Sequence, residues 1–211
     1  MKALGDRSIS SILTKVITVV WYLEFLLLLT PPLVFMDDDG IRYSWPVTLE
    51  TVGTKPTIHP TKNEITHFKL LERSDVHPAD AQTLSFEDAS TGRRLLQTLH
   101  NLVYIGLIMF ITWHLKKIFS GFSNDQPFLD NNAARIKWIG FSILFLVFFD
   151  VLEDVFHFMY TSSTIALTGA TFDQFNINFD FRTFFLGLLL LIMAEIFRKG
   201  YEYQSDSESI L

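Results

Sequence analysis

Ionisable and polar side chains recur at helical spacing inside two strongly apolar stretches of the chain. One set has offsets of 0, 3, 4 and 7 residues and the other has offsets of 0, 4, 7 and 11, which place all members of each set on one face of an α-helix. The sets are Asp150, Glu153, Asp154 and His157 within residues 135–160, and Arg93, Gln97, His100 and Tyr104 within residues 93–117. Glu24, near the middle of a third apolar stretch, is expected to face the same column and to share a proton with, or donate one to, Tyr104. These nine residues are the candidate ligand- or ion-binding residues.

Three acids within about two helical turns repel one another where the dielectric constant is low. We therefore expect one of them to be protonated, or Arg93, His100 and His157 to supply compensating charge. An antiparallel arrangement of the two helices puts three pairs at similar depth: Gln97 with His157, His100 with Asp154, and Tyr104 with Asp150.

Two interpretations of this polar column remain open. The side chains could only hold helices together, or they could form a site for protons, a cation or a small polar ligand. A metal is a narrower possibility, for which His100, Asp154 and His157 are weak candidates. Carboxylate oxygen with imidazole does not select one metal ion.

Composition excludes several other kinds of chemistry. The 211 residues contain no cysteine, which rules out disulfides, iron–sulfur clusters, thiolate zinc sites and covalently attached haem. A formal net charge of −6 without a basic stripe gives no footprint for nucleic acid. No nucleophile elbow, zinc-protease helix, P-loop or dinucleotide fingerprint occurs. We therefore predict no cofactor and a non-catalytic protein.

Four apolar runs are long enough to cross a hydrocarbon core about 30 Å thick. They predict an all-α membrane protein, a bundle of four transmembrane helices with a small extracytoplasmic β-rich insertion between the first two. The expected segments are a cytoplasmic N-terminus (1–15), transmembrane helices at 16–36, 93–117, 135–160 and 181–199, an extracytoplasmic β-rich domain (37–92), a cytoplasmic loop (118–134), an extracytoplasmic loop (161–180) and a cytoplasmic tail (200–211).

The distribution of basic residues sets the expected orientation. Lysine and arginine lie near the N-terminus, on both sides of the second loop and directly after the last apolar run, whereas residues 161–180 contain none. These basic residues are Lys2, Arg7, Lys15, Lys116, Lys117, Arg135, Lys137, Arg198 and Lys199. The positive-inside rule then places both termini in the cytoplasm. The lipid bilayer is the first expected partner.

The insertion at residues 37–92 has the pattern of short strands. Apolar and polar residues alternate from Ile41 to Leu49, the period of a sheet with one covered face. Pro46 predicts an edge strand or a bulge there. Two further short runs, at residues 65–71 and 83–86, complete a sheet of about three strands.

Several short motifs resemble a bacterial membrane family known as domain of unknown function 2975. They are Pro127–Phe128, Asn132–Ala133, residues 135–140 (Arg-Ile-Lys-Trp-Ile-Gly) and residues 191–200 (Leu-Ile-Met-Ala-Glu-Ile-Phe-Arg-Lys-Gly). The resemblance implies one span, an outer domain and three further spans, in the cytoplasmic (inner) membrane of a bacterium. It also implies a small membrane partner, sometimes encoded beside a helix-turn-helix regulator, and hence a regulatory or sensing role.

Three functions are compatible with these patterns. The first is a sensor or scaffold that a cytoplasmic or membrane protein partner reads through residues 116–137 and the tail. The second is transport or proton handling through the polar column, although the inner halves of the second and third helices are apolar. The third and weakest is an intramembrane metal-dependent enzyme.

Overall fold

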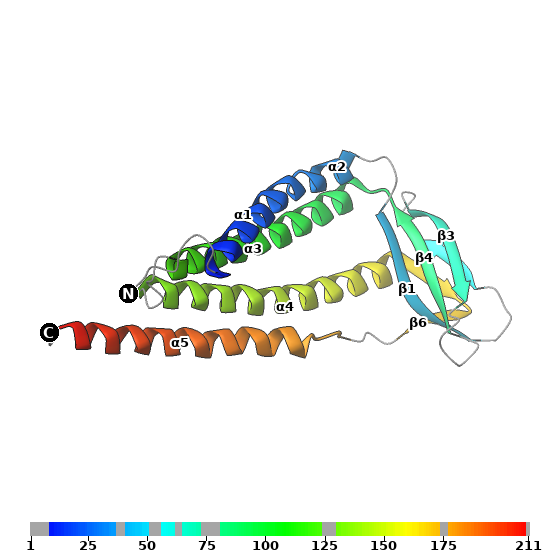
Figure 1. The fold of residues 1–211 in the computed structure, drawn as a ribbon. Coiled ribbons are helices and arrows are strands. Elements are labelled where there is room, and N and C mark those ends of the chain that lie inside the picture. Colours follow the sequence, from blue (N-terminus) through cyan, green and yellow to red (C-terminus); the bar gives the residue numbers. More distant parts are fainter. Residues whose placement is uncertain are drawn as a thin grey trace. The chain divides into compact units, whose positions relative to one another are not determined.

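The structure, a computed structural model, contains five helices and six strands in the residues that it describes (Figure 1). The described residues are 9–36, 41–50, 56–61, 65–72, 81–123, 130–173 and 177–209. In chain order the elements are α1 (Ile9–Leu27), α2 (Thr30–Met36), β1 (Ile41–Leu49), β2 (Thr57–Pro60), β3 (Ile65–Glu72), β4 (Ala81–Asp88), α3 (Thr91–Ser123), α4 (Asp130–Thr164), β5 (Ile165–Thr168), β6 (Ala170–Phe172) and α5 (Phe181–Ser209).

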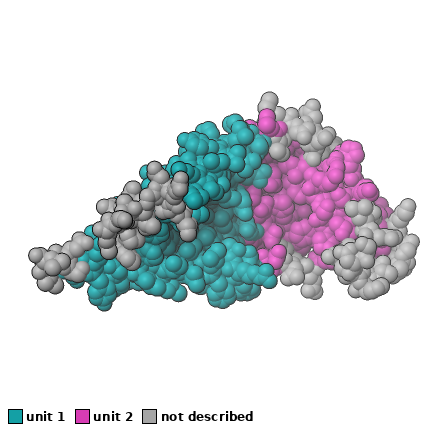
Figure 2. All heavy atoms as spheres, in the orientation of Figure 1, with its two compact units in different colours: residues 1–31, 101–150, 179–211 teal, residues 32–100, 151–178 magenta. Residues whose placement is uncertain are grey.

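The chain divides into two compact units (Figure 2). Residues 1–31, 101–150 and 179–211 form the helical unit, and residues 32–100 and 151–178 form the sheet unit. The long helices α3 and α4 are divided between the units: residues 91–100 and 151–164 belong to the sheet unit, and residues 101–123 and 130–150 to the helical unit.

The sheet unit is built on antiparallel pairing. Four strands pair in the order β3-β4-β1-β6, and β2 pairs with β5 in a separate ribbon. The register of β1 and β4 sets Tyr43 opposite Phe86, and both rings lie in a buried apolar cluster with Val47 and Leu84. The period-2 prediction for residues 41–49 is confirmed, because Tyr43, Val47 and Leu49 are buried on one face of the strand whereas Arg42 and Ser44 on the other face are exposed.

Two strands come from a part of the chain that was expected to be a loop. Strands β5 and β6 lie within residues 161–180, and β6 pairs with residues 47–49 of β1. Strand β1 is therefore internal, and the prediction of an edge strand from Pro46 is wrong. Pro46 is tolerated because it lies next to Val47–Leu49, the three residues of β1 that pair with β6. Its missing N–H therefore costs at most one hydrogen bond, at the end of this pairing.

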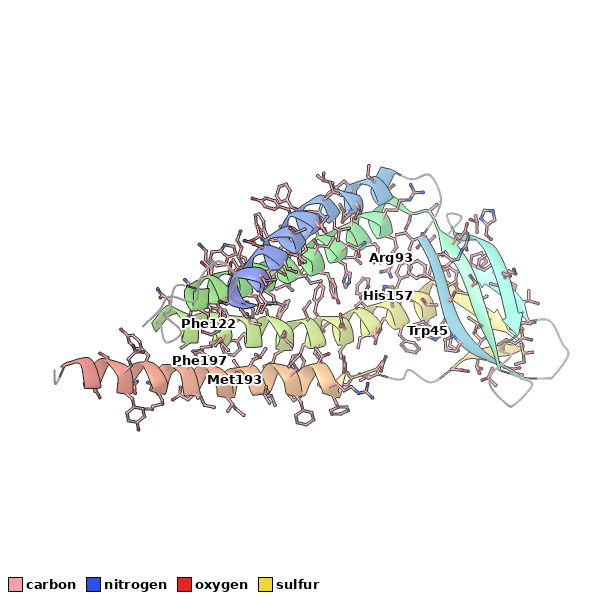
Figure 3. The ribbon with its side chains drawn as sticks, viewed as in Figure 1. Trp45, Arg93, Phe122, His157, Met193 and Phe197 are labelled. Carbon is pink, nitrogen blue, oxygen red and sulfur yellow. The ribbon has the colours of Figure 1, made fainter. Side chains whose placement is uncertain are left out.

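The last turns of α4 pack on the sheet within the same unit. The ring of His157 lies 5.3 Å from the ring of Tyr43, and the ring of Phe158 lies 5.5 Å from that of Trp45 (Figure 3). These contacts bring polar residues of α4 next to the core of the sheet.

The helical unit joins α3, α4 and α5 through a buried cluster of Ile118, Ile136, Ile139 and Ala194. Phe122 of α3 and Phe197 of α5 lie beside it, with their ring centroids 6.3 Å apart (Figure 3). Helices α4 and α5 cross closely at two glycines, because a Cβ atom on Gly187 would lie 3.3 Å from the carbonyl oxygen of Gly140.

The predicted bundle of four transmembrane helices is wrong. Among the described residues, two segments are long and apolar enough to cross a membrane by length and composition: Ser10–Leu33 and Thr91–Phe122. Helices α4 and α5 do not meet this test, and both contain charged side chains, among them Asp150 in α4 and Glu195 in α5. The fold is also not all-α, because six strands form a sheet region that draws on residues after α4 as well as the insertion.

Candidate functional site

A carboxylate between two imidazoles lies in the sheet unit, and we call these three residues the Glu153 cluster. The Nε2 atom of His100 on α3 lies 3.0 Å from Oε2 of Glu153, and Nε2 of His157 lies 3.4 Å from Oε1. All three side chains are half-buried. A carboxylate with two imidazoles can hold a proton or a small cation, and protonation of either histidine adds an ion pair.

The spacing of α4 explains part of this cluster. Glu153 and His157 are four residues apart and so lie on one face of the helix. The pairing with α3 differs from the predicted one, because Glu153, and not Asp154, meets His100. One residue corresponds to about 100° of rotation around a helix, and Asp154 makes no hydrogen bond or ion pair within the described chain.

Arg93 forms a second polar centre in the same unit (Figure 3). Its side chain is 4% exposed, and its Nε atom donates a hydrogen bond of 2.7 Å to the hydroxyl oxygen of Tyr43. The guanidinium carbon lies 4.9 Å from the ring centroid of Tyr43, 5.4 Å from that of Phe156 and 4.6 Å from that of Tyr160. Three aromatic faces therefore surround this cation, which is a favourable arrangement electrostatically.

Asp88 is the last residue of β4, shortly before α3, and is fully buried. Its Oδ1 atom accepts a hydrogen bond of 2.8 Å from the backbone N–H of Ser90, and its Oδ2 atom accepts one from the hydroxyl of Tyr160. Burial and this hydrogen bond raise the pKa of Tyr160 to about 12. Burial also raises the pKa of Tyr43. Both phenols are therefore neutral hydrogen-bonding groups at physiological pH.

Tyr43, Asp88 and Tyr160 were not among the predicted site residues. Asp88 had no helix-cap signal, because a capping residue directly precedes the helix, whereas two residues separate Asp88 from Thr91, the first residue of α3. Tyr43 had no local signal either, since its contact with Arg93 joins residues 50 positions apart. Strand pairing and helix packing bring these residues together.

The remaining predicted residues are divided between the two units. Gln97 is half-buried in the sheet unit, whereas Tyr104 and Asp150 belong to the helical unit and are exposed. Glu24 is also in the helical unit, where the hydroxyl of Thr112, and not Tyr104, donates a hydrogen bond of 2.7 Å to its Oε1 atom. Glu24 is 8% exposed and links α1 to α3.

The geometry gives no support to a metal centre. Within the described ranges, no group of three or more histidine, aspartate or glutamate side chains is arranged to hold a metal ion. His100 and His157 share Glu153, and Asp154 is not a partner of either.

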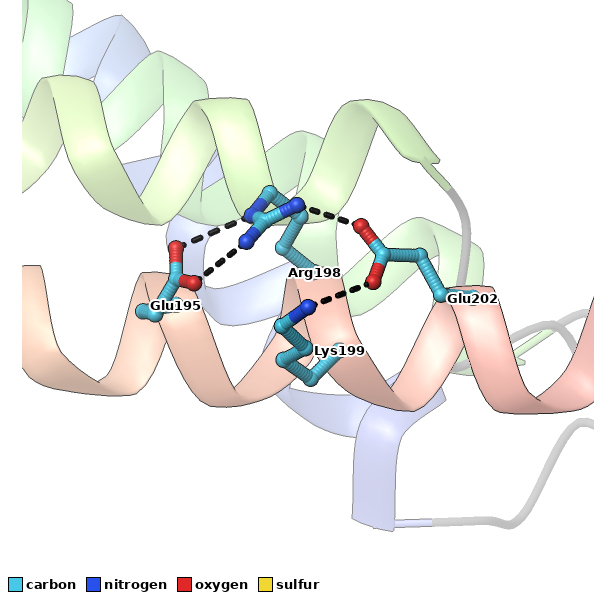
Figure 4. Close-up of polar contacts among 4 residues, drawn as sticks. All are labelled: Glu195, Arg198, Lys199 and Glu202. Atoms are coloured by element: carbon cyan, nitrogen blue, oxygen red, sulfur yellow. Dashed lines mark hydrogen bonds and ion pairs between the residues drawn. The ribbon is translucent and has the colours of Figure 1, made fainter.

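The charged side chains near the end of α5 pair along their own helix (Figure 4). Arg198 forms ion pairs with Glu195 and Glu202, and Nζ of Lys199 lies 2.9 Å from Oε2 of Glu202. The hydrogen bond to Arg198 lowers the pKa of Glu195. These surface pairs neutralise one another, so we assign them no separate site.

The sequence motifs noted at residues 127–140 and 191–200 fall inside a match to a known family. The family described as protein of unknown function DUF2975 matches residues 57–210, more than half of the chain. The chain belongs to the DUF2975 family. No curated protein and no solved structure matches this DUF2975 chain. Membership confirms the resemblance and assigns no activity.

Proposed function

We propose that this DUF2975 protein is a membrane-anchored, non-catalytic sensor or regulatory protein whose responsive part is the sheet unit. The Glu153 cluster is the observation that carries the proposal. It joins α3 to α4 through one ionisable carboxylate and two ionisable imidazoles. A proton or small polar ligand that changes this contact changes the energy of holding the two helices together.

Exposed apolar side chains support membrane anchoring. Leu26, Leu33 and Phe25 in the first apolar segment are 64%, 64% and 54% exposed. A soluble surface seldom carries such a continuous apolar area, and a lipid bilayer would cover it. The basic residues near the start of α1 and the end of α3 support a cytoplasmic position for those ends, and the proposal puts the sheet unit outside the cytoplasm.

The long helices offer a route from the cluster to a partner. Both α3 and α4 continue without interruption from the Glu153 cluster into the helical unit. A cytoplasmic or membrane protein that binds near residues 116–137 would sense a change in their packing. The proposal therefore includes such a partner, whose binding should change when the Glu153 cluster changes.

Anchoring and orientation can be tested by cysteine labelling, because the chain has no native cysteine. Thr66 on β3 and Lys117 on α3 are both exposed. We expect a membrane-impermeant maleimide to label Thr66→Cys, but not Lys117→Cys, in intact spheroplasts. Recovery of the protein in the soluble fraction, or equal labelling of both positions, would refute the anchored arrangement.

The sensing role needs a second measurement. A photocrosslinker at Lys117 should capture a specific partner, and Glu153→Gln should change the yield several-fold because the carboxylate loses its charge. The matched control is Glu50→Gln, an exposed glutamate of the same unit, which should leave the yield unchanged. If the two variants behave alike, the Glu153 cluster is only structural.

Proton or cation handling is the second candidate, favoured by the same carboxylate between two imidazoles. Purified protein in proteoliposomes would then carry a proton or cation flux that Glu153→Gln abolishes. Absence of flux for protons and common cations would remove this candidate and leave the sensing role intact.

A further inference from the structure

A cavity of about 450 Å³ opens at the start of α3 within the sheet unit. It is lined by Ser90, Thr91, Gly92, Arg93, Leu96, Phe156 and Tyr160. The first turn of the helix forms one part of its wall, and the aromatic rings that surround the Arg93 guanidinium form another.

The Arg93 guanidinium forms no ion pair within the described residues, and Glu153 interacts with its charge only at longer range. Its Nη2 atom is buried and has no hydrogen-bond acceptor within the described chain, and no described carboxylate lies within ion-pair distance of it. One phenol oxygen and three ring faces are its contacts. Such contacts offset only part of the cost of removing a guanidinium from water. A buried unpaired donor beside a cavity marks a place for an acceptor.

The helix end adds further donors on the same wall. The first backbone N–H groups of a helix have no acceptor within it and carry a partial positive charge. The carboxylate of Asp88 accepts hydrogen bonds from the backbone N–H of Ser90 and the hydroxyl of Tyr160, and not from the backbone N–H groups of Thr91 and Gly92. A Cβ atom built on Gly92 would meet no heavy atom within 4 Å, so the approach to this turn is open.

We infer that this cavity binds a small oxyanion, a carboxylate or phosphate group, between the Arg93 guanidinium and the N-terminus of α3. Phosphate and carboxylate oxygens match both a planar guanidinium and a helix N-terminus. The group can belong to a free anion or to the headgroup of an acidic phospholipid. This inference rests on the proposed sensing function, for which it supplies the ligand class.

Thermal unfolding of the purified full-length protein in a non-ionic detergent tests the site. The probes are sodium phosphate and sodium acetate against sodium chloride at equal ionic strength, and dihexanoyl phosphatidylglycerol against a monoacylglycerol without phosphate. At saturation we expect a bound anion to raise the melting temperature by about 5 °C. A shift with the free salts identifies a soluble anion, and a shift with the phospholipid alone identifies a lipid headgroup.

Three variants decide whether the shift belongs to the cavity. Arg93→Gln removes the charge, and Leu96→Trp fills the cavity from a side chain that is 40% exposed; both should abolish the shift. Arg42→Gln, which removes an arginine that is 73% exposed, should keep it. If Arg93→Gln does not fold, Leu96→Trp alone decides.

The inference is overturned if no probe shifts the wild-type protein, or if Leu96→Trp keeps the full shift. Cysteine labelling and photocrosslinking test the membrane-anchored sensor independently of the melting temperature. If the anion shift is absent while labelling and crosslinking give the expected results, the anion site alone is refuted and the proposed function is not.

Discussion

The close crossing of α4 and α5 predicts that an added methyl group at Gly187 loosens the helical unit. A Cβ atom there would lie 2.8 Å from both Cγ and Cδ2 of Leu144 and 3.3 Å from the carbonyl oxygen of Gly140. Glycine to alanine in a helix interior is favourable by about 1 kcal/mol, whereas an overpacked methyl group costs about 1–3 kcal/mol. Gly187→Ala should therefore destabilise the protein by up to about 2 kcal/mol.

Gly106→Ala is the matched control, because a Cβ atom at Gly106 would meet nothing within 4 Å. It receives the same helix-propensity gain without the clash, so it should stabilise the protein by up to about 1 kcal/mol. The propensity gain cancels between the two variants, and their stabilities should differ by about 1–3 kcal/mol. For a chain of this size that difference corresponds to roughly 2–12 °C in melting temperature.

Thermal unfolding in detergent, followed by tryptophan fluorescence, measures the difference. The double variant Gly187→Ala/Leu144→Ala should show a favourable coupling, because removing the leucine side chain makes room for the methyl group. Equal melting temperatures for Gly187→Ala and Gly106→Ala would refute the close crossing, and additive effects in the double variant would refute the role of Leu144.

Three further changes have directions set by single contacts. The pKa of Tyr160 is raised to about 12 in the folded protein, above the ordinary tyrosine pKa of about 10. The neutral phenol therefore contributes fully to the free energy of unfolding below about pH 10, and this contribution is lost as the pH rises toward 12. Melting temperatures at pH 9 and pH 11.5 should therefore fall further apart in the wild type than in Tyr160→Phe. Thr112→Val removes the hydroxyl that donates to buried Glu24 and should lower the free energy of unfolding by about 1–3 kcal/mol, measured by thermal unfolding. The control is Thr98→Val, because the hydroxyl of Thr98 donates to the carbonyl oxygen of Arg94 in its own helix. Gly169→Ala should cost about 1–2 kcal/mol, because Gly169 has φ of +84° and alanine is strained there; a wild-type melting temperature would contradict this.

Local periodicity was sufficient for the elements that depend on near neighbours. The strand at residues 41–49 follows from alternate apolar side chains, since successive residues of a strand point to opposite faces. The spacing of Glu153 and His157 predicted a shared helical face in the same way, and the structure confirms it. The family resemblance was also correct, because its motifs are short and contiguous.

Periodicity could not determine how these elements meet. The choice of Glu153 over Asp154 as the partner of His100 depends on the rotation of α4 against α3, which tertiary packing sets. The pairing of β6 with β1 joins residues more than 120 positions apart. The hydrogen bond of Arg93 to Tyr43 requires both the strand and the helix to be in place.

The number of membrane-crossing helices shows the same division. Apolar length alone predicted four spans, whereas two segments meet the test of length and composition within the described chain. Local sequence therefore determined the long helices, the strand at residues 41–49 and the shared helical face of Glu153 and His157, because those depend on near neighbours in the chain. Tertiary structure decided which acid meets His100 and what surrounds Arg93, because burial and charge pairing depend on residues distant in the chain.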